Sequence, residues 1–220
     1  MDLLAPVKTK RDDRRAAILK IARAAFLQDG YAGTSMSQIA ATVHGSKGTL
    51  YNYFPSKKDL LVAVADEETT QILGPVFDVC ERRGDIRMVL ERLVRHLLVA
   101  MLSNDLIAFY RIVVAESARF PEIGATAEEF GAKRGVESMA EYFAEAIERG
   151  ELQRTNVHVA AEQFLDLCAG HLHRRRLWGV IGAVSPDVIE AEVEHIVATF
   201  LATYGNDQLS SAARAQIATR

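Results

Sequence analysis

The stretch that decides the fold is SMSQIAATVHGSKGTLYNYF, which covers residues 35–54. Ser35 followed three residues later by Gln38 is typical of a helix N-terminus, because each side chain can bond the backbone N–H of the other residue. Apolar residues then recur at helical spacing, and a second helix begins after Ser46. Two short helices around a tight glycine turn predict a helix-turn-helix, whose second helix can enter the major groove of DNA.

Positive charge is concentrated around this motif. Residues 1–58 carry ten Lys or Arg and four acidic residues, whereas the whole chain has a formal net charge of −3. A net charge of +6 for residues 1–58 therefore leaves −9 for residues 59–220. A basic head on an acidic body indicates that one part of the chain meets a polyanion. The alternative is a solvated basic surface beside an ordinary helical hairpin.

At 220 residues, of which 49% are hydrophobic, the chain can form a small helical head and a larger helical body. It has neither an apolar run of membrane-spanning length nor a signal-peptide pattern, so we expect a cytoplasmic protein with no membrane partner. Cys80 and Cys168 are too few for a disulfide framework. Nucleophile-elbow, phosphate-loop and zinc-helix motifs are missing, so we expect no enzyme, no cofactor and no metal.

The spacing of the apolar residues predicts an all-α fold. Capping residues, apolar stripes and proline breaks predict body helices over roughly 57–74 (with a kinked extension to 83), 85–101, 104–120, 122–149, 157–180 and 186–204. Residues 205–220 are small and polar, so we expect a flexible tail there.

Several short patterns in the head occur in a fixed order. They are Ile18-Leu19, Gly30-Tyr31, Thr34-Ser35 and, over residues 46–54, SKGTLYNYF. This order, over roughly residues 12–62, resembles the DNA-binding domain of TetR-family transcriptional regulators. The segment YRIVVAESARFP, residues 110–121, is similar to the branch of that family with an AefR-like C-terminal domain.

The resemblance implies a division of the chain and a set of DNA contacts. A three-helix helix-turn-helix domain would cover residues 1–56, with a basic arm over about 1–12, and an effector-binding and dimerisation domain would cover 57–204. The matching positions for contacts to bases or phosphates are Thr34, Ser35, Ser37, Ser46, Lys47, Gly48, Thr49, Tyr51, Asn52, Tyr53 and Lys57. The chain departs from the family at His44-Gly45, where the usual order of glycine and a small apolar residue is reversed, which leaves the aim of the second helix open.

The last two predicted helices, 157–180 and 186–204, carry broad apolar faces. One face can cover the body, and the remaining width indicates either an ordinary core pair or a second chain. The resemblance favours a homodimer that pairs through these helices. Its interface would then include Phe164, Cys168, Trp178, Val193, Val197 and Phe200.

Polar residues scattered among the apolar helices are candidates for an effector pocket, since such pockets are mainly apolar with a few orienting polar groups. These candidates are His96, Tyr110, Arg111, Glu116, Tyr142 and His171. A metal site built from His171 and His173 is a sharper alternative, but residues two apart point to different sides of a helix.

Together these features favour a ligand-responsive dimeric repressor. It would bind a palindromic operator in double-stranded DNA and release it when a small, mostly apolar effector binds the body. One alternative is a DNA-binding regulator with no ligand, which a body without a pocket would favour. The other is an all-helical enzyme, which the missing catalytic motifs disfavour.

Overall fold

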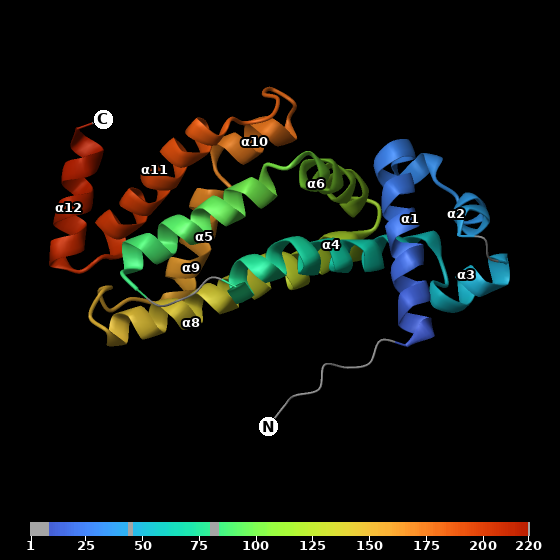
Figure 1. The fold of residues 1–220 in the computed structure, drawn as a ribbon, viewed down its shortest axis with the longest axis horizontal. Coiled ribbons are helices and arrows are strands. Elements are labelled where there is room, and N and C mark those ends of the chain that lie inside the picture. The colour runs from blue at the N-terminus through green and yellow to red at the C-terminus, as the bar shows by residue number, and fades with distance from the viewer. Residues whose placement is uncertain (1–8, 44–45, 80–83, 220) are drawn as a thin grey trace. The chain divides into compact units, whose positions relative to one another are not determined.

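The structure is a computed structural model, and it describes residues 9–43, 46–79 and 84–219 (Figure 1). Helices make up the regular structure of these ranges, with one isolated bridge between Leu152 and Gly205. The all-α expectation is therefore confirmed. The chain separates into two compact units, which we call the head (residues 1–67 and 112–126) and the body (residues 68–111 and 127–220).

The head is built from α1 (Lys10–Gly33), α2 (Met36–Thr42), α3 (Lys47–Tyr53) and the first turns of α4 (Lys57–Val79). Thr9 and Asp12 form a capping box that begins α1. Near its end, α1 passes through Gly30, whose φ of 71° lies in the left-handed region that glycine adopts without strain. The helices close over an apolar core formed by Ile18, Leu19, Ala22, Phe26, Ile39, Leu50, Phe54, Leu60 and Leu61.

A segment distant in sequence completes the head. The end of α6 (Asn104–Ser117) and all but the last residue of α7 (Pro121–Ala127) belong to it. Ile123 is fully buried, and the ring centroid of Phe120 lies 5.6 Å from that of Tyr31. The head therefore differs from the expected residues 1–56, because the sequence pattern does not reveal which later segment covers its core.

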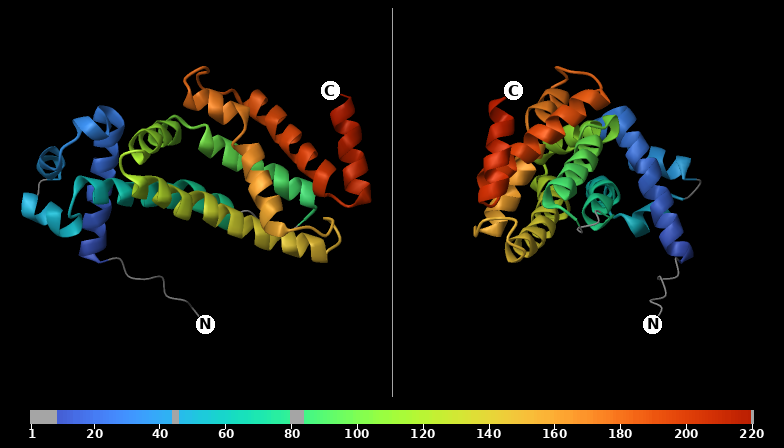
Figure 2. Two further views of the ribbon diagram at one scale, coloured as in Figure 1. Left: turned by 180° about the vertical axis from the view of Figure 1, so that it is seen from behind. Right: turned by 60° about the vertical axis from the view of Figure 1, so that its left-hand side comes forward.

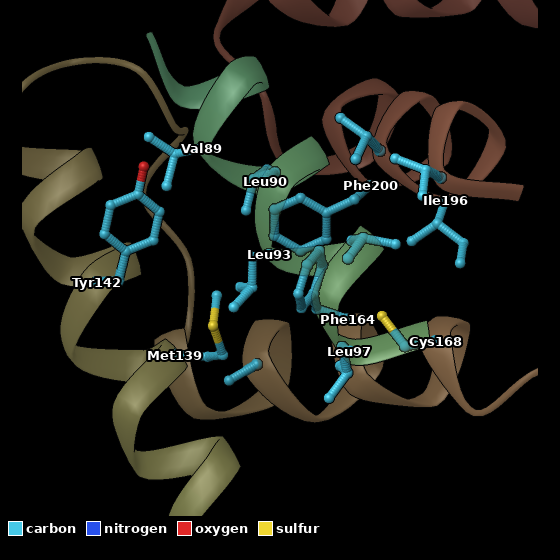
Figure 3. Packing of buried hydrophobic residues seen from close by; sticks show 14 of the residues in the cluster. Val89, Leu90, Leu93, Leu97, Met139, Tyr142, Phe164, Cys168, Ile196 and Phe200 are labelled. Carbon is cyan, nitrogen blue, oxygen red and sulfur yellow. The ribbon is translucent and has the colours of Figure 1, made fainter. Parts of the chain in front are cut away.

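The body contains α5 (Ile86–Met101), the π-helix η1 (Glu128–Lys133), α8 (Arg134–Glu148), α9 (Val157–Cys168), α10 (His171–Leu177), α11 (Pro186–Tyr204) and α12 (Asp207–Ala218). Its core is centred on aromatic rings from three helices (Figure 3). Phe143 stacks on Phe200 at 4.8 Å between centroids, and Phe164 meets Phe200 edge-on at 5.0 Å. Leu90, Leu93 and Leu97 of α5 pack against the same cluster.

Two expectations about the C-terminal part differ from the structure. The helix expected over 157–180 is divided into α9 and α10 around Gly170, whose ψ of −144° is not helical. Residues 207–218, expected as a flexible tail, form α12, which packs beside α11 (Figures 1 and 2). Asn206 caps α12 by accepting from the N–H of Leu209, and Ala213 is fully buried. A good cap and one small buried face stabilise a helix that composition alone did not predict.

Among the described residues, no single helix has the length and hydropathy of a membrane span. Helices α5 and α6 reach that length and hydropathy only when taken together, and their axes are bent by 66° at the break between them.

Candidate nucleic-acid interface and ligand cavity

The helix-turn-helix forms through local capping, as the sequence predicts. Ser35 Oγ accepts from the N–H of Gln38 at 3.2 Å, and Gln38 Oε1 accepts from the N–H of Ser35 at 2.8 Å. Ser46 Oγ accepts from the N–H of Thr49 at 3.0 Å and so begins α3. Leu50 of α3 is buried, which turns the remaining side chains of this helix away from the core.

The face that α2 and α3 turn away from the core carries most of the predicted DNA-binding residues. Thr49 and Tyr53 are half-buried, and the exposed members of the set are Ser35, Ser37, Ser46, Lys47, Gly48, Tyr51 and Asn52. A Cβ added at Gly48 would meet only Ser46 Oγ, at 3.7 Å, so the backbone there is open to a close approach. The face combines one ammonium, one amide, hydroxyl groups and a phenol, all groups that contact DNA bases or phosphates.

Basic residues of α1 lie next to this face. The Arg11 guanidinium is 6.0 Å from the ring centroid of Tyr53, and that of Arg15 is 5.6 Å from the ring of Phe54. The basic start of α1 therefore adjoins the C-terminal end of α3. Such an arrangement adds positive charge along one edge of the candidate interface.

Thr34, predicted to cap α2 near a phosphate, and Lys57, predicted to neutralise a phosphate, both have internal partners in the structure. The Thr34 hydroxyl is buried and donates to the backbone oxygens of Ala25 and Gly30 at 3.1 and 2.8 Å. Lys57 Nζ donates to the backbone oxygens of Tyr31 and Thr34 at 2.6 and 2.9 Å. Desolvation lowers the pKa of Lys57. The final carbonyls of a helix need donors from elsewhere, and these two side chains supply them for Gly30 and Tyr31 near the end of α1.

We expect Lys57→Met to destabilise the head, because two backbone oxygens would lose a charged donor. A hydrogen bond to a charged group contributes about 1.5–3 kcal/mol, so urea unfolding should show a loss of that order. Lys20→Met, which removes an exposed ammonium from α1, is the matched control and should leave stability nearly unchanged. Full stability of Lys57→Met together with weaker DNA binding would instead make Lys57 a phosphate contact.

The residues assigned to a dimer interface lie mostly in the body core. Phe164, Cys168, Val193, Val197 and Phe200 are at most 2% exposed within one protomer, whereas Trp178 is 68% exposed. These five side chains already have partners in their own chain, and of the five Phe200 also lines a groove between α9 and α11. Helical periodicity identifies a buried stripe, but it does not tell which chain covers it.

A cavity of about 730 Å³ lies in the body. It is lined by Leu97, Met101, Tyr110, Glu128, Gly131, Ala132, Lys133, Gly135, Val136, Glu137, His158, Glu162, Leu165, Asp166 and Ala169, which come from α5, α6, η1, α8 and α9. Its size is within the usual range for small-molecule sites. Sequence reasoning missed its charged residues, although the placement of Glu162 and Asp166 one turn apart on α9 was a usable signal.

Tyr110 is the effector candidate that the structure places in the wall of this cavity. The others lie elsewhere among the described residues. His96 is exposed, Arg111 donates to the backbone oxygens of Leu177 and Arg176, Glu116 belongs to the head, and His171 is exposed with Nδ1 3.5 Å from Glu192. Tyr142 is buried in the core, and this burial raises its pKa to about 12.

The described residues contain no group of three or more His, Cys, Asp or Glu that could hold a metal ion. Cys168 is a free thiol, and burial raises its pKa above the usual range. Cys80 and the His44-Gly45 turn lie outside the described residues.

Comparison with known families decides the identity of the fold. Residues 88–206 match the AefR-like transcriptional repressor C-terminal domain, and residues 18–64 match the bacterial regulatory proteins of the tetR family. The chain belongs to the TetR family. The expected AefR-like branch is confirmed for residues 88–206. The relatives that the chain resembles are transcriptional regulators.

Individual relatives agree with this assignment. A DNA-binding transcriptional repressor TetR from Mycobacteroides abscessus is 35% identical over 75 residues, which span 34% of this chain and only 40% of that protein. A TetR-family regulator structure from Mesorhizobium loti has a TM-score of 0.83 at 26% identity and covers 90% of this chain and 100% of its own. The flavonoid-responsive regulator FrrA has a TM-score of 0.76 at 28% identity, with 89% and 98% covered.

Proposed function

We propose that this TetR-family chain is a homodimeric repressor that binds a palindromic DNA operator and releases it when a small, mostly apolar effector enters the body. The observation that carries the DNA-binding part is the outer face of α3. Leu50 is 3% exposed and fixes the helix in the head, while Tyr51 is 47% exposed and Lys47 and Asn52 are exposed beside it. That face has the size and polarity of a major-groove reader.

The side chains on this face divide into two roles. Lys47 at the start of α3 pairs well with the acceptors of guanine, and Asn52 pairs well with adenine. Tyr51, the exposed serines and the basic start of α1 are suited to phosphates, which supply affinity without sequence choice. We therefore assign sequence readout to Lys47 and Asn52.

For the dimer we propose the groove between α9 and α11. It has a volume of about 340 Å³ and is lined by Gln163, Asp166, Leu167, Thr199, Phe200, Thr203 and Tyr204. The Tyr204 hydroxyl donates to Gln163 Oε1 at 2.6 Å and ties the two helices together. Paired helices from two chains would form a four-helix interface with two-fold symmetry, which matches a palindromic operator.

We expect Leu167→Arg to separate the dimer, because it places a charge in the proposed interface at a half-buried residue on the edge of the core. A charge that is buried without a partner destabilises an interface by several kcal/mol, as shown by the cost of about 3–5 kcal/mol for removing one partner of a buried ion pair. Light scattering at micromolar concentration should then report the mass of one chain. Met88→Arg on α5, where Met88 is 67% exposed, is the matched control; equal masses for both variants would place the interface elsewhere.

The body cavity supports a ligand-controlled switch. Its lining is largely apolar. The similar structure FrrA, at 28% identity, is described as a flavonoid-responsive regulator. The effector would favour a conformation in which the two recognition helices are mis-spaced for the operator. Coupling of this kind is typically about 1–3 kcal/mol, or roughly five- to 150-fold in operator affinity.

The test is fluorescence anisotropy with the DNA upstream of the chain's own gene against random DNA of equal length. Binding to the upstream DNA should be tighter and should fall steeply with salt, because several phosphates are neutralised. Ligands found by thermal shift are then added to the protein–DNA complex. Equal affinity for both DNAs at every salt concentration would refute the operator, and hits that leave operator affinity unchanged would favour a ligand-independent regulator.

A further inference from the structure

The body cavity has two chemically different parts. Its interior wall is apolar and is formed chiefly by the buried Leu97, Met101, Gly131 and Gly135 and the half-buried Leu165. Its exposed lining, which we call the rim, carries four carboxylates, one ammonium and one imidazole: Glu128, Glu137, Glu162, Asp166, Lys133 and His158. A ligand that fills this space therefore meets hydrocarbon on one side and charge on the other.

The single ammonium of the rim is already matched by a carboxylate outside the cavity lining. Lys133 Nζ lies 3.0 Å from Glu129 Oε2, and this hydrogen bond raises the pKa of Lys133. The four rim carboxylates therefore exceed the positive charge available to them. A cleft lined by one sign of charge concentrates the opposite ion, since its low-dielectric walls focus the field.

The rim carboxylates also converge from separate elements. Glu128 lies on η1, Glu137 on α8, and Glu162 and Asp166 lie one turn apart on α9. Like charges four residues apart disfavour a helix. A positive ligand group between α8 and α9 would offset that repulsion, and an anionic ligand would increase it.

Tyr110 adds an aromatic surface to the same cavity. Its ring lines the wall and meets the His173 ring edge-on, with 5.4 Å between centroids. Burial raises the pKa of Tyr110, so the phenol is neutral and its ring face can attract a cation. The segment beside it, η1, is a π-helix, a rare form that is frequent at functional sites.

We propose that the effector class of this chain is an amphipathic organic cation. Its apolar or aromatic part would lie on the interior wall, and its quaternary ammonium or protonated amine would lie at the carboxylate rim. This inference rests on the proposed ligand switch and narrows it from any apolar molecule to positively charged ones.

The experiment uses three biphenyl compounds of similar size on the full-length protein. One carries a trimethylammonium group, one is the neutral methanol derivative, and one is the carboxylate anion. Isothermal titration calorimetry without DNA measures binding, and anisotropy of labelled operator measures release. We expect the cation to bind at least about tenfold more tightly than the other two, since both a net charge and an aromatic contact favour it.

Two variants locate the charge that is responsible. The double variant Glu137→Gln/Glu162→Gln, which changes two exposed carboxylates of the cavity that do not line the α9–α11 groove, should weaken binding of the cation by about four- to 25-fold, because each exposed carboxylate contributes about two- to fivefold. It should leave the neutral compound unchanged. Glu148→Gln, which removes an exposed carboxylate of α8 outside the cavity, is the matched control and should change neither affinity.

Each outcome separates this inference from the proposed function. The cation class is overturned if the neutral or anionic compound binds more tightly, or if the cation does not bind at millimolar concentration. In either case the proposed switch still holds if the neutral or anionic compound releases the operator. Equal effects of the rim and control variants would show that the overall acidity of the body is responsible, which also overturns it. Tight, rim-dependent binding of the cation without operator release supports the site and contradicts the switch.

Discussion

Replacing Phe200 with alanine is expected to destabilise the protein by about 3–5 kcal/mol, the usual range for a large buried aromatic residue. Phe200 is 1% exposed and contacts the rings of Phe143, Phe164 and Tyr204 at centroid distances of 4.8, 5.0 and 5.0 Å. Truncation would remove three ring contacts at once and leave a cavity at the centre of the core (Figure 3). Thermal unfolding followed by circular dichroism should show a Tm lower by roughly 6–20 °C for a chain of this size.

The control for this variant is Val188→Ala, at a position of α11 that is 46% exposed and outside the proposed dimer groove. Both variants must be measured at one protein concentration, because dimerisation shifts apparent stability by mass action. Similar Tm values for Phe200→Ala and Val188→Ala would mean that the aromatic cluster is not the centre of the folded core.

Lys47→Ala and Asn52→Ala should change which operator bases are preferred. A good base contact contributes about 1–3 kcal/mol of discrimination, so the preferred site should lose roughly five- to 150-fold in affinity per contact while random DNA is bound nearly as before. A symmetric dimer repeats each contact in both half-sites, which doubles the effect in free energy. Selection from a random oligonucleotide pool measures the altered preference.

Tyr51→Phe is the comparison variant, since it removes a hydroxyl suited to phosphate and keeps the ring. It should lower affinity for all sequences about equally and leave the selected motif unchanged. An identical motif for the wild type, Lys47→Ala and Asn52→Ala would assign sequence readout to other residues.

The parts of the head that sequence reasoning predicted depend on local interactions. The capping box of Ser35 and Gln38, the cap at Ser46 and the buried Leu50 each need only residues within one helical turn. Such short-range geometry follows from residue type and spacing, which is why the candidate DNA-binding face could be predicted.

Several predicted site residues have internal partners far away in sequence. Lys57 bonds oxygens 23 and 26 residues earlier, and nothing near it in the sequence indicates this. Phe164 and Val197, which are fully buried in their own chain, were assigned to an interface because an apolar stripe looks the same whether its own chain or a second chain covers it. The cavity likewise forms only when five elements meet, so Tyr110 was the one lining residue named beforehand.

The discontinuous head also limits how this chain can be recombined with its relatives. Residues 1–67 contain the whole helix-turn-helix, yet Ile123 and Phe120, from residues 112–126, cover part of the same unit, and Glu122 binds Lys58 Nζ at 2.8 Å. A chimaera joined at a single point in α4 would combine the helix-turn-helix of one protein with the segment of another protein that corresponds to residues 112–126. Transferring this helix-turn-helix to the effector-binding body of another family member therefore requires exchange of both segments, 1–67 and 112–126. The alternative is to change Tyr31 and Lys58 so that they fit the α6–α7 segment of the recipient.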